Sequence, residues 1–207
     1  MKIYDISTPI YEGMPVWEAD QNKQPKIQTT TTDYITESRL DINLHSGTHV
    51  DAPLHMLPNG ATFESIHLEK LVTVVKLFDL TQVNDGITKE DIKGLNIQEG
   101  DFILFKTKNS FDTAFNFNFI FVKEDAAAFL AERKIAGVGI DSLGIERSQE
   151  NHPTHKTLFQ NDIIILEGLR LKEVDPGNYF MVAAPLKLNV TEAAPARVLL
   201  MKDLPSI

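Results

Sequence analysis

The stretch LHSGTHVDAPLHM, residues 44–56, holds the densest group of metal-binding residue types in the chain and sets the local fold. Three of the six histidines lie in it, together with one aspartate. Gly47 and Pro53 disfavour a continuous helix here, because glycine weakens a helix and proline breaks it. We therefore expect a strand that ends in a tight loop, not two histidines stacked one helical turn apart.

The polar residues of this stretch have the spacing of a metal site. In an extended segment residues two apart share a face, so His49 and Asp51 can point at one ion. Gly47 allows a bend that brings His45 to the same point. Two imidazoles and a carboxylate suit Zn²⁺, Mn²⁺ or Fe²⁺ and leave positions for water. A single histidine is usually structural or exposed, and the clustering is what favours a metal here.

His55 follows Asp51 by four residues and lies beyond Pro53. The residue pattern leaves two roles open for it. It can be a fourth metal ligand, or it can stand beside the metal and move protons, since imidazole titrates near neutrality.

The rest of the chain predicts many short strands and few helices. In residues 35–44, Leu40, Ile42 and Leu44 fall on one face, which is the period of a half-buried strand. β-Branched and aromatic residues predict further strands at 2–7, 72–80, 101–107, 137–141, 162–169, 179–188 and 196–202. Composition and capping residues predict helices at 88–95, 123–134 and near 155–161. We expect one domain, residues 1–207.

Composition excludes several classes of protein and site. The chain has 207 residues, 43% of them hydrophobic, and a formal net charge of -9. This charge opposes nonspecific binding to nucleic acid or to an anionic membrane. There is no cysteine, so disulfides, thiolate metal sites and a cysteine nucleophile are excluded. The N-terminal residues lack the apolar core of a secretory signal and no run is long enough to span a bilayer, so we expect a cytoplasmic location.

The run from His45 to His55 matches in full the HxGTHxDxPxH signature of the cyclase family of metal-dependent hydrolases, which the chain resembles. Two further segments extend the similarity over about residues 1–170. Asp5-Ile6-Ser7 and Met14-Pro15-Val16-Trp17 resemble the start of the family sequence. His155 precedes Glu167 by twelve residues, and the segment around Glu167 resembles that of the family's arylformamidases.

The resemblance implies an α/β protein with the swivelling β/β/α fold, a barrel-like mixed sheet and few helices. It implies one or two Zn²⁺ ions, with Mn²⁺ as an alternative. His45, His49 and Asp51 would bind the first ion, and Asp51, His155 and Glu167 the second, with Glu167 reaching both ions. His55 would be the proton donor and acceptor, and Trp17 would line the substrate pocket. The small-molecule substrate would be an amide such as N-formylkynurenine, hydrolysed by water activated on the metal, in a homodimer or larger homo-oligomer.

Other readings stay open at this point. Trp17 is followed by Glu18-Ala19-Asp20 where formamidases have Pro-Gly-Asp, so the substrate loop differs. A metal-dependent cyclase or lyase, a hydrolase of another cyclic amide or ester such as isatin, and a metal-binding protein without catalysis are the alternatives. His67 and His152 match no motif. By residue type alone, we expect Asp41, Asn43 and Asp141 to orient the ligand imidazoles.

Overall fold

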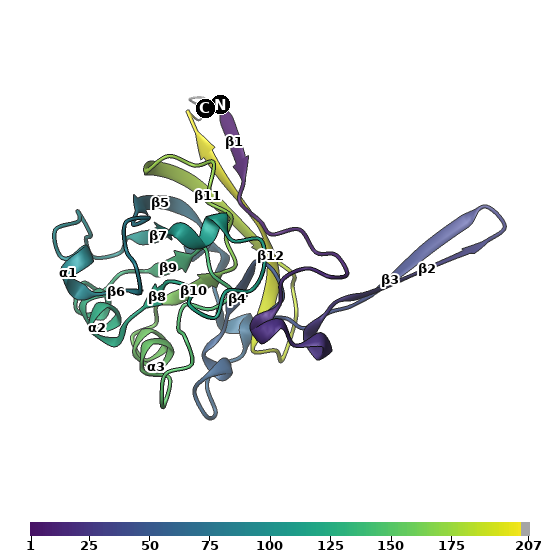
Figure 1. Cartoon of the computed structure of the whole chain (residues 1–207), viewed down its shortest axis with the longest axis horizontal. Helices are drawn as coiled ribbons and strands as arrows, with labels where there is room; N and C mark the ends of the chain where they lie inside the picture. Colours follow the sequence, from purple (N-terminus) through teal and green to yellow (C-terminus); the bar gives the residue numbers. More distant parts are fainter. Residues whose placement is uncertain (204–207) are drawn as a thin grey trace.

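Seven strands close into a barrel in the computed structural model, which describes residues 1–203 (Figure 1). Around the barrel the strand order is β12-β11-β5-β7-β9-β10-β4, and β4 pairs back onto β12. The bounds are β4 (His49–Asp51), β5 (Val72–Asp79), β7 (Phe102–Lys106), β9 (Gly137–Ile140), β10 (Ile164–Glu167), β11 (Gly177–Pro185) and β12 (Ala193–Lys202). An eighth strand, β1 (Lys2–Asp5), pairs with the other end of β12.

Strands β5, β7, β9 and β10 run parallel to one another, and the remaining barrel pairings are antiparallel. The carboxyl ends of the four parallel strands therefore lie together at one end of the barrel, along the rim of the sheet. Binding sites of mixed and parallel sheets gather at such a rim. Glu167 is the last residue of β10 and lies there.

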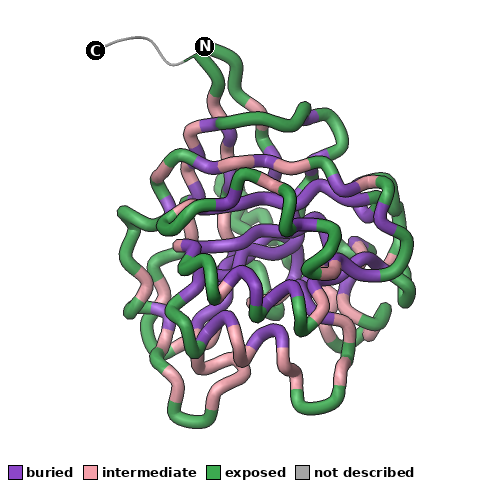
Figure 2. The backbone as a smooth tube through the Cα atoms, turned by 90° about the vertical axis from the view of Figure 1, so that its left-hand side faces the viewer, coloured by how far each residue is buried: buried purple, intermediate pink, exposed green. Residues whose placement is uncertain are grey.

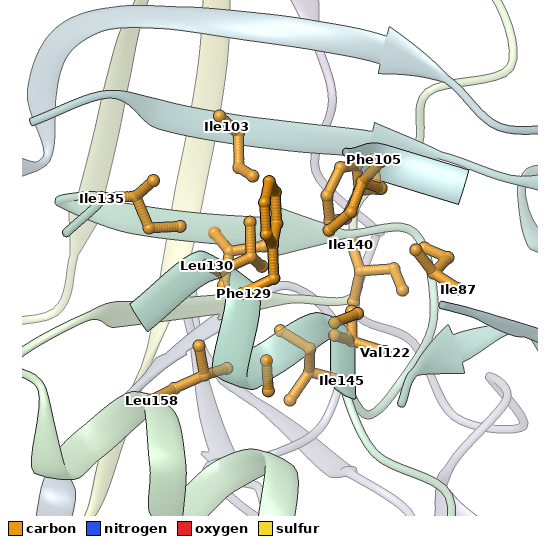
Figure 3. Close-up of a cluster of buried hydrophobic side chains, with 14 of the residues drawn as sticks. Ile87, Ile103, Phe105, Val122, Phe129, Leu130, Ile135, Ile140, Ile145 and Leu158 are labelled. Atoms are coloured by element: carbon orange, nitrogen blue, oxygen red, sulfur yellow. The ribbon is translucent and has the colours of Figure 1, made fainter. Parts of the chain in front are cut away.

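Successive side chains of the buried strands point alternately into two hydrophobic cores, one inside the barrel and one between the sheet and the helices. In β7, Phe102 and Leu104 point into the barrel, whereas Ile103 and Phe105 point outward to the helices. All four are at most 1% exposed. Figure 3 shows the outer core, in which Ile103 and Phe105 face side chains from the helical layer. Strands buried on both faces explain the continuous apolar runs in the sequence.

Three α-helices cover the outer face of the parallel strands in the described part of the chain (Figure 1). They are α1 (Lys89–Ile92), α2 (Glu124–Glu132) and α3 (Pro153–Gln160). Thr88 and Asp91 form a capping box at the start of α1. A short parallel pair, β6 (Gly86–Ile87) and β8 (Phe121–Val122), lies beside them. 3₁₀ turns occupy Trp17–Ala19, Gln21–Lys23, Pro53–His55, Phe63–Ser65, Leu68–Lys70 and Lys108–Phe111.

The fold confirms the predicted class, an α/β protein with a closed, barrel-like mixed sheet and few helices. Every predicted strand and helix is present with shifted ends. Figure 2 shows the buried residues following the strands through the centre, with exposed loops around them. In residues 1–203, no helix is both long and apolar enough to span a membrane.

One prediction was wrong in its burial. Residues 35–44 were expected to form a half-buried strand, but β3 (Ile35–Asp41) is exposed at every residue. Among residues 1–203 it pairs only with β2 (Lys26–Thr32), likewise exposed throughout, and the two form a hairpin that projects from the body (Figure 1). Leu40 is 49% exposed. We call this β2–β3 hairpin the arm.

Candidate metal centre

Strand β4 carries two of the predicted ligands at the seam where the barrel closes. His49 and Asp51 are its first and last residues, and both are at most 1% exposed. Two residues apart on a strand, they point to the same face. In the antiparallel register of β4 with β10, Glu167 lies directly opposite His49. Directly opposed residues share a face, so three ligand-type side chains meet at this seam.

His45 reaches the same point from the turn that precedes β4. Gly47, within this turn, has a φ of 72°, a region that glycine adopts without strain. The His45 backbone N–H donates to the Asn43 side-chain oxygen at 3.0 Å. The His45 Nδ1 atom lies 3.0 Å from Asp51 Oδ1, and its Nε2 atom lies 3.4 Å from Glu192 Oε1.

Glu167 and His155 complete the cluster from a distant part of the sequence. Glu167 places Oε2 3.2 Å from His49 Nε2 and Oε1 3.4 Å from His155 Nε2. His155 lies in the first turn of α3 and is 4% exposed. Its Nε2 atom is 3.9 Å from Asp51 Oδ2. The structure thus brings all five residues predicted as ligands into one cluster, in which only the His45 side chain, at 19%, is partly exposed.

Oppositely charged groups face one another in this cluster. Burial opposes a charge on His49, yet the carboxylates of Asp51 and Glu167 keep its pKa well above the usual value. Burial also opposes a charge on Asp51, yet His49 and His45 keep its pKa well below the usual value. The carboxylates therefore require a positive charge beside them, which protons supply when no metal ion does.

The donor set fits a divalent ion. His45 Nε2, His49 Nε2 and both carboxylate oxygens of Asp51 are buried without a hydrogen-bond partner among the described residues. Buried polar atoms are rarely left in this state, so they point to a ligand. Two atoms each about 2.1 Å from one ion, at roughly 90–110°, lie about 3.0–3.4 Å apart. The closest distances in the cluster, 3.0–3.4 Å, match this spacing.

His55 lies against the cluster at the end of the 3₁₀ turn Pro53–His55. Its ring centroid is 4.1 Å from that of His45 and 5.6 Å from that of His155. Burial lowers the pKa of His55 to about 4, and the nearby His45 adds to this effect against the opposing Asp51 carboxylate. The ring is therefore neutral at pH 7.

Trp17 packs in an aromatic group with Phe115 and Phe119, at centroid distances of 5.5 and 5.6 Å. It also lies against Gly144, where a Cβ atom would come within 2.6 Å of the indole. Phe115 and Phe119 line a cavity of about 270 Å³ that opens between the loop 109–119 and the residues after β9 and β10. Trp17 therefore lies beside this cavity and packs against the loop that follows β9.

The sequence-based choice of orienting residues was wrong. Asp41 is exposed, and Asn43 binds the backbone of His45, not its ring. Asp141 is buried, but it accepts hydrogen bonds from Thr107 and Ser110. Residue type alone does not determine the partner, and in the fold Asn43 and Asp141 contact other groups.

The ring contacts come from groups that the sequence did not mark. Glu146 accepts from His155, and the backbone oxygen of Gly47 lies 3.0 Å from His49 Nδ1. In the sequence, only its position nine residues before His155 could have indicated Glu146 as a partner of that ring. His152, which matches no motif, also places a ring nitrogen near Glu146 and His155, whereas His67 is exposed.

Comparisons with known proteins agree with this geometry. The family model described as "Putative cyclase" matches residues 4–147. Kynurenine formamidase of Salinibacter ruber is 31% identical, and the alignment covers 99% of both chains. The solved structure of a "potential metal-dependent hydrolase with cyclase activity" superposes with a TM-score of 0.95 at 65% identity, over 99% of both chains.

A second solved structure, of a "predicted metal-dependent hydrolase from Bacillus stearothermophilus", has a TM-score of 0.91 at 67% identity. That match covers 96% of this chain and 97% of the other. The sequence match extends over more than half of the chain, and the structural matches extend over nearly all of it. The chain therefore belongs to the cyclase family of metal-dependent hydrolases.

Proposed function

We propose that this enzyme hydrolyses the C–N bond of a small aryl formamide, with N-formylkynurenine as the favoured substrate. The observation that carries the proposal is the group of buried His45, His49 and Asp51 side-chain atoms without hydrogen-bond partners among the described residues. The similarity to a kynurenine formamidase over the full chain supports the substrate class.

The residues that would hold the metal divide into two overlapping sets. His45, His49 and Asp51 would bind one ion, and Asp51, His155 and Glu167 a second. Zn²⁺ suits imidazole and carboxylate ligands, and Mn²⁺ is the alternative. When bound, such an ion supplies Lewis acidity, which makes water nucleophilic near neutral pH and polarises a carbonyl group. Support for two ions comes from Asp51, whose two oxygens face different histidines.

His55 would move the proton. Its neutral ring can accept a proton from the attacking water and return it to the leaving nitrogen. An amide needs that second transfer, because an amine anion is a poor leaving group. The ring lies close enough to His45 and His155 to reach a group bound between them.

The aromatic group of Trp17, Phe115 and Phe119 would favour an aryl substrate over an aliphatic one. The loop after Trp17 departs from the formamidase pattern in sequence, with Ala19 where formamidases have glycine. Ala19 nevertheless has a φ of 54°, in the left-handed region that favours glycine. We infer that the loop keeps a similar backbone course while its side chains change the fit of the substrate.

A hydrolysis screen tests the proposal. The chelated protein and the protein restored with Zn²⁺ or Mn²⁺ would be assayed on aryl formamides, isatin and simple esters. We expect metal-dependent release of formate from aryl formamides. Activity only on isatin would make the enzyme a hydrolase of cyclic amides. Product formation in ¹⁸O-labelled water without incorporation of ¹⁸O would overturn hydrolysis in favour of a cyclase or lyase.

We also propose that the enzyme is a homo-oligomer in which the arm packs on a second copy of the chain. A single two-stranded hairpin is marginally stable in water. The arm nevertheless keeps seven paired positions in each strand while all of its strand residues are exposed. Ile27 and Leu40 are paired on one face, and each is more than 40% exposed. A second copy that covers this face would supply the missing burial.

A further inference from the structure

Glu146 is a buried carboxylate that the proposed reaction does not yet use. It is 2% exposed and comes from the loop that follows β9. One oxygen accepts the backbone N–H of Thr154 at 3.2 Å. The other accepts the backbone N–H of His155 at 3.0 Å and lies 2.8 Å from His155 Nδ1. The contact with the ring is the shortest of the three.

This contact decides which ring nitrogen of His155 carries the proton. A carboxylate only accepts hydrogen bonds, so Nδ1 must be the protonated nitrogen. In the neutral ring the lone pair then lies on Nε2, which is the atom that faces Glu167 at 3.4 Å and Asp51 at 3.9 Å. The backbone bonds fix Glu146 itself to the first turn of α3, so the carboxylate cannot swing away from the ring.

The neighbouring residue acts on the other ligand of the same set. The Ile145 backbone N–H donates to Glu167 Oε1 at 2.5 Å. Residues 145 and 146 thus orient both His155 and Glu167. No hydrogen bond from either residue to His45, His49 or Asp51 is found in the described part of the chain. The orienting contacts are therefore specific to one half of the cluster.

We propose that Glu146 is a positioning residue that prepares His155 to bind the second metal ion. It fixes the tautomer and the ring direction of His155 and leaves the first set of ligands untouched. This inference rests on the proposed function, since it needs a second ion between Asp51, His155 and Glu167. Partners of ligand histidines commonly contribute 10–100-fold to metal affinity.

The test compares Glu146→Gln with Glu150→Gln in the full chain. Glu150 is an exposed carboxyl group on the same loop and serves as the matched control. The ion-free proteins would be titrated calorimetrically with Zn²⁺ and, separately, with Mn²⁺. In Glu146→Gln we expect the second ion to bind about 10–100-fold more weakly and the first with unchanged affinity. Glu150→Gln should match the wild type for both ions.

A second measurement uses the wild-type protein, so it does not depend on whether a variant folds. Long-range ¹H–¹⁵N spectra of the Zn²⁺-loaded wild type report which nitrogen of each histidine carries a proton. We expect His155 to be protonated at Nδ1 and bound to the ion through Nε2. A ring bound through Nδ1 would overturn the inference, and would instead place an ion between Glu146, His152 and His155.

The possible outcomes distinguish failure of the proposed role of Glu146 from failure of the proposed two-ion site. If Glu146→Gln binds both ions like the wild type, while His155→Ala loses the second, Glu146 has no positioning role and the two-ion site stands. Equal weakening of both ions would make Glu146 a purely structural residue and overturn the inference. A wild type that binds a single ion would remove the second site, and with it any role for Glu146.

Discussion

Among single residues, substitution of His55 offers the test that distinguishes a role in proton transfer from a role in metal binding. Its ring packs on that of His45, and burial lowers its pKa to about 4. We predict that His55→Gln lowers kcat by about 10²–10⁴-fold, the usual contribution of a general acid–base group, and keeps the metal content of the wild type. Steady-state kinetics and metal analysis on the same preparation check this.

The matched control is His67→Gln, because His67 is exposed. This variant should keep both activity and metal. Loss of metal from His55→Gln would show that His55 is a ligand, which is the other role that its sequence position allows. Full activity in His55→Gln would contradict the proton-transfer role.

Asp141 gives the chain a pH-dependent stability. Burial raises its pKa from 3.8 to about 6, against the hydrogen bonds from Ser110 and Thr107, which lower it. The folded chain thus binds more protons than the unfolded chain between these two values. This carboxyl group therefore stabilises the fold most at low pH, and that contribution is lost as the pH rises through about 6.

The gap between the two pKa values corresponds to about 3 kcal/mol. We predict that the free energy of unfolding of the wild type, relative to Asp141→Asn, falls by about this amount from about pH 4 to 7. Urea unfolding across this range measures the difference. The exposed Glu173 provides the control variant Glu173→Gln, for which the difference should stay flat. A flat difference for Asp141→Asn would show that the buried group stays ionised.

Residue patterns predict the first half of the site better than its surroundings. His45, His49 and Asp51 lie within seven positions, so a local backbone argument brings them together. The contact of Glu146 with His155 depends on how α3 packs against the loop after β9. Such a contact spans elements whose relative placement is set by the core, and no local spacing records it. The pairing of His155 and Glu167 came from family resemblance for the same reason.

At the scale of elements, the backbone at the end of β10 packs directly against the backbone of the turn before β4. Gly168 has a φ of 70°, and a Cβ atom there would lie 2.2 Å from the backbone oxygen of Gly47. We predict that Gly168→Ala destabilises the fold by about 2–4 kcal/mol, from left-handed strain and backbone displacement. Chemical denaturation of the ion-free chain measures this.

Gly94 offers the matched control, because a Cβ atom there meets nothing within 4 Å. Gly94→Ala should change the free energy of unfolding by less than about 1 kcal/mol. Stability of Gly168→Ala equal to that of the wild type would mean that the two turns do not cross as closely as they do here.

Strand positions follow from sequence, but burial does not always follow. The runs that form β7, β9 and β10 are apolar on both faces and become the centre of the sheet. In β3 the alternation of Leu40 with polar neighbours predicts one covered face, yet within a single chain that face is open. The alternation of apolar and polar residues predicts that one face of the strand is buried, but it does not identify the segment or molecule that buries it. A second copy of the chain would reconcile the pattern with the structure.

For the whole molecule, the arm predicts the state of association. We expect the wild type to sediment as a dimer or larger oligomer. The double variant Ile27→Glu and Leu40→Glu should shift it toward monomer, because two charges would have to be buried in the proposed interface. Sedimentation velocity at several concentrations measures the shift.

Leu68→Glu is the control, since Leu68 is 59% exposed and lies outside the arm. It should leave the sedimentation coefficient unchanged. A monomeric wild type, or a double variant that associates as the wild type does, would contradict the role of the arm.

The shortest barrel strand, β4, is held by only three residues on either side, against β10 and β12. Its two end residues are proposed ligands, and the opposing Glu167 is a third. An ion bound here would link neighbouring strands at the seam where the barrel closes. Ligand-linked stabilisation would reach about 2.7 kcal/mol at an ion concentration 100-fold above Kd. Metal supply in the cell would then set not only the activity of this enzyme but also its lifetime against proteolysis.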